Sequence, residues 1–125
     1  MPIEPENLSI LIVDDERDLR EVIHLELEMF GYKIFEAGSG NEALSLCKDE
    51  KIDVIISDIR MPDGDGMHLL TNVKKSHPQI PVVILMTGYS EYAKDDLLQQ
   101  GATAFFEKPL DCEEINDFIL KACDS

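Results

Sequence analysis

Residues 9–15, with the sequence SILIVDD, join a short apolar run directly to two carboxylates. Three further segments share this plan, in which an apolar run ends in a polar side chain: VIISD at 54–58, VVILMT at 82–87 and AFFEK at 104–108. Amphipathic stretches separate the runs, and this alternation is typical of an α/β fold with helices on both faces of a parallel sheet. Parallel strands end at one edge of their sheet, so three carboxylates, a hydroxyl and an ammonium group are expected to meet there. The sequence therefore predicts a site for a cation and a phosphoryl group.

The composition is that of a single acidic domain. A chain of 125 residues with 44% hydrophobic content fits one core, and 26 acidic against 11 basic residues give a formal net charge of −15. That charge argues against direct binding of nucleic acid or of an anionic membrane, because both need clustered Lys and Arg. The cysteines and histidines show no spacing typical of a disulfide framework or a zinc site. A protein or a cation is therefore the expected partner.

The sequence contains no signal for a membrane. No apolar stretch approaches the roughly 18 residues that a membrane-spanning helix needs. The first seven residues, MPIEPEN, lack the basic and apolar regions of a signal peptide. We therefore expect a cytoplasmic protein without membrane association.

Five strands and five helices are predicted in strict alternation. The strands are expected at 9–13, 33–37, 53–58, 82–86 and 103–107. The helices are expected at 16–30, about 39–48, after the loop at 61–66, about 90–100 and after Asp111. The first helix is predicted to bury apolar residues at helical spacing, namely Leu19, Val22, Ile23, Leu27 and Phe30. The fourth helix has only a narrow apolar stripe, and such weak packing predicts mobility.

Asp14, Asp15 and Asp58 are the candidate metal ligands. Carboxylates gathered at one edge repel one another, and a hard divalent cation such as Mg²⁺, which prefers oxygen ligands, removes that penalty. An isolated Asp14-Asp15 pair would equally fit a loop with a helix N-cap. Asp58 differs because it ends an apolar strand, where an unpaired buried charge is costly. Asp58 therefore needs a metal, a cation or a reaction.

Lys108 and Thr87 complete the predicted site. The Lys108 ammonium can pair with Asp58 when the site is empty and with a phosphoryl oxygen when it is filled, and Thr87 can donate a hydrogen bond to a second oxygen. Each residue alone would fit an ordinary strand end. Because aspartate can accept a phosphoryl group covalently, attack by Asp58 on a phosphorylated donor is a coherent mechanism.

In this arrangement the chain resembles the receiver domain of a two-component response regulator over nearly its whole length. The resemblance rests on Val13-Asp14-Asp15, Asp58-Ile59-Arg60-Met61-Pro62 with Gly66, Thr87-Gly88 and Lys108-Pro109. It implies a flavodoxin-like, doubly wound, five-stranded parallel sheet of order 2-1-3-4-5 with five helices. Residues 8–124 would form the receiver domain, and residues 1–7 an N-terminal extension.

The resemblance also implies a phosphorelay function centred on Asp58. A sensor histidine kinase or a histidine phosphotransfer protein would phosphorylate Asp58 from a phosphohistidine, and small phosphodonors could replace it. Asp15, Asp58 and the backbone carbonyl of Arg60 would ligate Mg²⁺ or Mn²⁺ directly, Asp14 would act through a water, and Thr87 and Lys108 would bind the phosphoryl group. Such a protein is not a conventional enzyme, although it phosphorylates itself from a donor and slowly loses the phosphoryl group.

A conformational switch is a further implication of the resemblance. Thr87 would move toward the phosphoryl group and Phe105 would swing inward, which reshapes the face of the fourth helix, fifth strand and fifth helix for an output domain or a downstream protein. Phe105 stands where the family often has tyrosine, so it lacks the hydroxyl. It would equally serve as core filling, and a one-residue shift in register would bury Phe106 instead. Arg60 and Tyr89 are expected to tune the lifetime of the aspartyl phosphate, in a direction left open.

Two other classes of protein compete with this interpretation. A Mg²⁺-dependent phosphohydrolase with an aspartate nucleophile needs an acid two residues after the nucleophile, where this chain has Arg60. A docking module that is not phosphorylated, or a flavodoxin-like cofactor binder, is disfavoured because Asp14-Asp15 stands where a Gly-rich loop would lie and every reactive position is filled. A homodimer through the last helices is left open.

Overall fold

The computed structural model describes residues 4–61, 65–87 and 101–123. Five parallel strands form one sheet of order β2-β1-β3-β4-β5, which confirms the predicted doubly wound α/β architecture. The strands are β1 Ser9–Val13, β2 Lys33–Ala37, β3 Val54–Asp58, β4 Val82–Thr87 and β5 Ala104–Glu107. Since all strands run in the same direction, the polar residues that end them share one edge.

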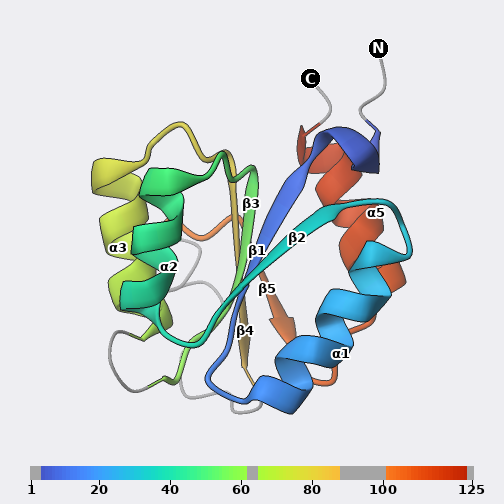
Figure 1. Ribbon diagram of the computed structural model, residues 1–125, viewed down its shortest axis with the longest axis horizontal. Coiled ribbons are helices and arrows are strands. Elements are labelled where there is room, and N and C mark those ends of the chain that lie inside the picture. Colours follow the sequence, from blue (N-terminus) through green and yellow to red (C-terminus); the bar gives the residue numbers. More distant parts are fainter. Residues whose placement is uncertain (1–3, 62–64, 88–100, 124–125) are drawn as a thin grey trace.

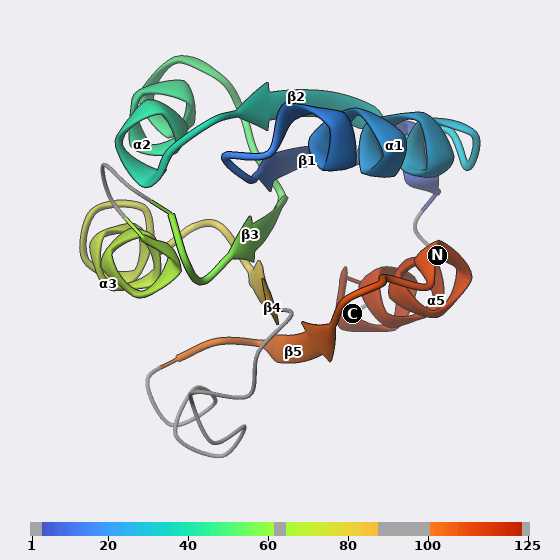
Figure 2. The ribbon, with the colours of Figure 1, turned by 90° about the horizontal axis from the view of Figure 1, so that it is seen from below.

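Helices cover both faces of the sheet. The described part of the chain contains a short 3₁₀ helix, η1, and four α-helices: η1 Pro5–Asn7, α1 Arg17–Glu28, α2 Gly40–Asp49, α3 Gly66–Ser76 and α5 Cys112–Cys123. Figure 2 shows α1 and α5 on one face and α2 and α3 on the other. The helix expected at 90–100 lies outside the described residues. No helix of the described residues combines the length and apolar character that crossing a bilayer requires.

Local capping explains where α2 and α3 begin. Ser39 Oγ accepts a hydrogen bond from the Glu42 amide at 3.1 Å, as the predicted capping box requires, although the Glu42 carboxylate bonds to the amide of Gly38 rather than to that of Ser39. The Asp65 carboxylate accepts from the His68 amide at 2.8 Å at the start of α3. These side chains satisfy amide groups that no preceding helical turn can reach.

The core lies in two layers, one on each face of the sheet. Successive strand residues point to opposite faces, so Leu11, Val13 and Ile55 pack toward α2 and α3 while Ile10 and Ile12 pack toward α1 and α5. Every residue of β3 and β4 is buried, whereas β2 is only partly buried. Figure 1 and Figure 2 show β2 at one edge of the sheet. The long apolar runs of the sequence are thus the central strands, as predicted.

The predicted buried face of α1 was wrong at Val22. This side chain is 52% exposed, whereas Ile23 and Leu27 are buried and Leu19 and Phe30 are partly buried. One residue along an α-helix turns the side chain by about 100°. The sheet and α5 cover a stripe centred on Ile23 and Leu27, so Val22 lies outside it.

A close approach of backbones fixes α3 against the end of β3. The Gly66 amide donates to the Ile59 carbonyl at 2.8 Å, and a Cβ atom built on Gly66 would lie 2.5 Å from the Asp58 carbonyl oxygen and 2.8 Å from Ile59 Cα. Real Cβ atoms do not approach backbone this closely, so only glycine fits here. The start of α3 therefore lies directly against the backbone that carries Asp58.

We expect Gly66→Ala to lower the free energy of unfolding by about 3 kcal/mol, because α3 must move away from β3 to admit the methyl group. Urea denaturation followed by circular dichroism measures this loss. Gly38→Ala is the matched control, since the nearest atom to its added methyl group would be Arg20 Nη1 at 3.4 Å, an ordinary van der Waals distance, and it should change stability little. Equal stabilities of the two variants would contradict the close-approach explanation.

Candidate functional site

The predicted acidic residues converge at the carboxyl edge of the sheet. Asp14, Asp15 and Asp58 each offer a carboxylate oxygen, and these oxygens lie within 4.8 Å of one another. Asp14 is fully buried and Asp58 is 7% exposed, whereas Asp15 is open to solvent. β1 positions the first two residues and β3 positions the third. A cluster of hard oxygen donors with one open side suits a divalent cation such as Mg²⁺ or Mn²⁺.

Lys108 bridges the two buried carboxylates. Its Nζ donates to Asp14 Oδ2 at 3.1 Å and to Asp58 Oδ2 at 3.3 Å. The Lys108 amide also donates to the Thr87 carbonyl at 2.9 Å, so the ends of β4 and β5 are tied together beside the acidic cluster. The predicted pairing of Lys108 with Asp58 is therefore present, and Asp14 shares the same cation.

Burial controls the electrostatics of Asp58. Burial raises the pKa of its carboxyl, the Lys108 ammonium offsets part of that rise, and the Asp14 carboxylate adds to it, so the pKa stays above its ordinary value. The backbone amide of Arg60 also donates to this carboxylate. For Lys108, burial would lower the pKa, but its bonds to both carboxylates raise it above the ordinary value. Lys108 is thus a permanent cation at neutral pH.

Asp14 has both of its carboxylate oxygens engaged. Oδ1 accepts from the Glu16 amide at 2.9 Å, and Oδ2 accepts from Lys108. The helix-cap interpretation that an isolated pair would allow is therefore partly right, since Asp14 bonds to the amide just before α1. Asp15 and Asp58 are the carboxylates better placed to contact a cation directly.

Thr87 and Arg60 lie at the same edge of the sheet. Thr87 ends β4 and is 4% exposed, and Arg60 is an exposed residue two positions after Asp58. Tyr89, the other expected lifetime-tuning residue, lies outside the described residues, as do Pro62 and Gly88. The structure thus brings Asp14, Asp15, Asp58 and Lys108 together, and it places Thr87 and Arg60 at the ends of the neighbouring strands.

The two phenylalanines of β5 face opposite sides of the sheet. Phe105 pairs in register with Leu85 and packs against the core layer beneath α2 and α3. Phe106 packs on the other face, where its ring meets Phe118 edge to face with centroids 5.9 Å apart. Both rings are partly buried, so the observed register does not bury one phenylalanine and expose the other.

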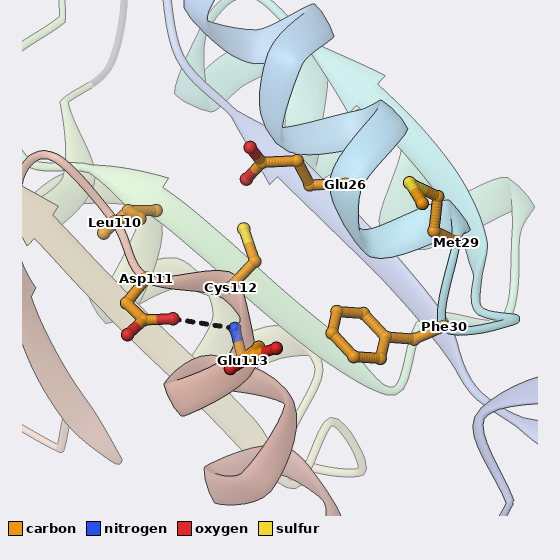
Figure 3. A pocket seen from close by; sticks show the side chains of 7 residues that line it. All are labelled: Glu26, Met29, Phe30, Leu110, Asp111, Cys112 and Glu113. Carbon is orange, nitrogen blue, oxygen red and sulfur yellow. Dashed lines mark hydrogen bonds between the residues drawn. The ribbon is translucent and has the colours of Figure 1, made fainter.

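A separate hollow of about 510 Å³ lies between α1 and the start of α5 (Figure 3). Its lining mixes apolar and acidic side chains, namely Glu26, Met29, Phe30, Leu110, Asp111, Cys112 and Glu113. Burial and the neighbouring Glu26 raise the pKa of the Cys112 thiol to about 12, which keeps this thiol protonated and unreactive at neutral pH. The hollow shares no residue with the acidic cluster.

The chain matches the family model described as the response regulator receiver domain over residues 10–120. It therefore belongs to the receiver domains of two-component response regulators, as the sequence motifs predicted. These domains are signal receivers that become phosphorylated rather than conventional enzymes, so the phosphohydrolase and docking-module alternatives find no support.

Three similar proteins illustrate the relationship. The chain is 39% identical over 115 residues to transcriptional regulatory protein GlrR of Escherichia coli, covering 92% of this chain and 25% of GlrR. It is 35% identical over 119 residues to sporulation initiation phosphotransferase F of Bacillus subtilis, covering 92% of this chain and 93% of that protein. The structure of Thermotoga maritima response regulator TrrA in complex with Mg²⁺ and BeF matches with a TM-score of 0.82 and 33% identity, covering 92% and 98% of the two chains. The chain thus spans about a quarter of the length of GlrR but nearly all of the second relative.

We expect Asp58→Asn to raise the free energy of unfolding at pH 7 by about 1–2 kcal/mol, because it removes a buried carboxylate that Asp14 repels while Lys108 keeps Asp14 as its partner. The folded-state pKa of Asp58 is raised, so ionisation costs stability above that pKa and the cost vanishes as pH falls below the ordinary value.

Urea denaturation of both proteins at pH 7 and near pH 3.5 checks this prediction, and the advantage of the variant should shrink at the lower pH. Asp117→Asn, an exposed site on α5, is the matched control. A variant less stable than the parent at pH 7 would show that Asp58 stabilises the fold instead.

Proposed function

We propose that Asp58 is the phosphoacceptor of a phosphorelay and that a phosphohistidine of a sensor histidine kinase or a histidine phosphotransfer protein is its donor. The observation that carries the proposal is the Lys108 bridge, which holds a cation 3.3 Å from a buried carboxylate at the acidic edge. A buried carboxylate with a raised pKa is costly to keep ionised, and such groups are concentrated at functional sites.

Phosphoryl transfer from the phosphohistidine to Asp58 needs no further reactant. An oxygen of the Asp58 carboxylate attacks the phosphorus, the P–N bond to the donor imidazole breaks, and its electron pair returns to the ring nitrogen. Lys108 shifts from Asp58 to an oxygen of the incoming phosphoryl group and keeps its bond to Asp14. Thr87, tied to the same turn through its carbonyl, would donate its hydroxyl to a second phosphoryl oxygen. The hydrogen bonds from Lys108 and Thr87 would become stronger as negative charge develops on the phosphoryl oxygens.

Mg²⁺ is the cofactor that we propose for this site. Asp15, Asp58 and the Arg60 carbonyl would hold the ion directly, and Asp14, whose oxygens are engaged, would contribute through a water. When bound, the ion supplies positive charge that offsets the repulsion between the carboxylates and the phosphoryl oxygens. The structure of TrrA with Mg²⁺ and BeF supports this proposal by analogy.

The switch and the partners are part of the same proposal. Movement of Thr87 would let Phe105 turn inward and reshape the face around β5 and α5, through which an output domain or a downstream protein would be controlled. Arg60 and Tyr89 would tune the lifetime of the aspartyl phosphate. A homodimer is a further expected partner, since an NtrC4 receiver domain was solved as a beryllofluoride-activated dimer. We assign residues 8–124 to the receiver domain and residues 1–7 to an N-terminal extension.

Incubation with acetyl phosphate and Mg²⁺ should add one phosphoryl group to the protein, which intact-mass spectrometry detects. Asp58→Asn should show no adduct, because its amide cannot act as the nucleophile, whereas Asp117→Asn should behave like the parent. Chelation of Mg²⁺ should suppress the reaction in the parent. An undiminished adduct on Asp58→Asn would remove Asp58 as the acceptor.

Beryllofluoride with Mg²⁺, which mimics the phosphoryl group, should shift the NMR signals of the Phe105 ring more than those of the Phe106 ring. The reason is that only Phe105 lies on the face that the proposed movement of Thr87 repacks. A shifted Thr87 amide together with an unchanged Phe105 ring would refute the switch while leaving the acceptor role of Asp58 intact.

A further inference from the structure

A second charged network lies behind the acidic edge, where β1, α1 and β2 meet. Arg20 of α1 donates from Nη1 to the backbone carbonyl of Asp14 at 2.7 Å and from Nε to Glu36 Oε1 of β2 at 2.7 Å. The other oxygen of Glu36 lies 2.6 Å from His24 Nδ1. Arg20 has only 17% of its side chain exposed, so this network is largely shielded from water. Sequence patterns did not single out these residues, although Arg20 lies one turn into the helix after Asp14-Asp15 and was a usable signal.

His24 is a cation and holds the Glu36 carboxylate in place. Its Nε2 lies 3.1 Å from the Glu28 carboxylate, so both ring nitrogens face carboxylate oxygens. Carboxylates only accept, and a neutral imidazole has a single donor, so both contacts require the imidazolium. Burial alone would raise the pKa of Glu36, but the hydrogen bonds from His24 and Arg20 lower it below its ordinary value. Glu36 is therefore an anion held between two cations.

Arg20 completes the fixation of Asp14. The Asp14 amide donates to the Ala37 carbonyl at 3.1 Å, and its two carboxylate oxygens bond to Glu16 and Lys108. The Arg20 bond holds the carbonyl, which is the remaining polar group of this residue. That carbonyl and the amide of Asp15 belong to one planar peptide unit, so holding one sets the plane of the other. The same plane contains the Cα atom of Asp15, from which the carboxylate side chain leaves the backbone.

We propose that Arg20 is a positioning residue for the metal site: by holding the Asp14–Asp15 peptide plane it aims the Asp15 carboxylate at Asp58, and the pair Glu36 and His24 orients the guanidinium. Because Arg20 contacts Asp14 through the backbone carbonyl, it would act on the cation and the phosphoryl group only indirectly. Its charge is balanced by Glu36, so it acts through orientation rather than through its electric field. This inference rests on the proposed Mg²⁺ site, and it assigns to that site a support that lies outside the sequence motifs of the strand ends.

The direct test is the Mg²⁺ affinity of Arg20→Gln, measured on the full chain by isothermal titration calorimetry at fixed salt. Loss of a group that orients a ligand should raise the Kd for Mg²⁺ roughly tenfold. Arg17→Gln removes the same charge from the same helix, where Arg17 forms only an exposed pair with Glu21, and should leave the Kd within about twofold of the parent value.

Kinetics with acetyl phosphate separate positioning from a loss of chemistry. The Mg²⁺ concentration needed for half-maximal phosphorylation should rise in Arg20→Gln by the same factor as the Kd, while saturating Mg²⁺ should restore the parental rate. Arg20→Lys should give an intermediate Kd, because an ammonium can still donate to the carbonyl but lacks the planar fork that also engages Glu36. A merely structural role would change stability without this graded effect on Mg²⁺.

Glu36→Gln keeps the test decisive if Arg20→Gln does not fold. An uncharged amide holds the guanidinium less firmly, so the Kd should rise by a smaller factor than in Arg20→Gln while Arg20 stays in place. Equal Mg²⁺ affinities in the parent, Glu36→Gln and every folded Arg20 variant would overturn the inference. Such a result, with normal phosphorylation of the parent, would leave the acceptor role of Asp58 standing, whereas absence of any adduct on the parent would refute the proposed function itself.

Discussion

The structure depends on one electrostatic constraint: two neighbouring carboxylates are buried and share a single ammonium group as their cationic partner. Asp14 and Asp58 are both buried, and Lys108 donates to each of them. A buried ion pair rarely adds stability over an apolar contact, and here one cation faces two anions. The arrangement therefore keeps a charge imbalance at the edge of an otherwise apolar sheet. That imbalance suits the site to the divalent cation and to the phosphoryl transfer that we propose for it.

The rest of the fold holds this imbalance in place. The central strands β1 and β3 are buried on both faces, which leaves Asp14 and Asp58 no route to solvent except at the strand ends. The Lys108 amide is tied to Thr87, and Gly66 lets α3 lie against the backbone of Asp58 and Ile59. Arg20 of α1 also holds the site in place, through its bond to the Asp14 carbonyl. Elements from the whole chain thus meet at one edge, which is typical of a site at the carboxyl ends of parallel strands.

Much of the fold and of the site was predictable, and the exceptions have physical reasons. The apolar runs identified the strands because a parallel sheet covered on both faces demands them. The side of α1 that holds Val22 was predicted wrongly, because periodicity gives the spacing of an apolar stripe but not how wide a stripe the neighbouring elements cover. Glu42 formed its bond to Gly38 instead of Ser39, because the detailed path of the chain before α2 is not contained in the capping pattern. The Arg20 network was missed because it joins Arg20 and His24 of α1 to Glu36 of β2 and to the Asp14 carbonyl just after β1.

The sequence by itself determined the class of fold, the acidic and basic residues at the strand ends and the family to which the chain belongs. These features follow from local order along the chain: apolar runs, their spacing and the residue that ends each run. Only the tertiary structure decided which atoms meet. Lys108 lies 94 residues from Asp14 and 50 from Asp58, and its position between their oxygens depends on strand register and helix packing. The same holds for the opposite faces taken by Phe105 and Phe106 and for the Arg20 bond to the Asp14 carbonyl, since contacts of a few ångströms between distant segments are set by packing rather than by sequence spacing.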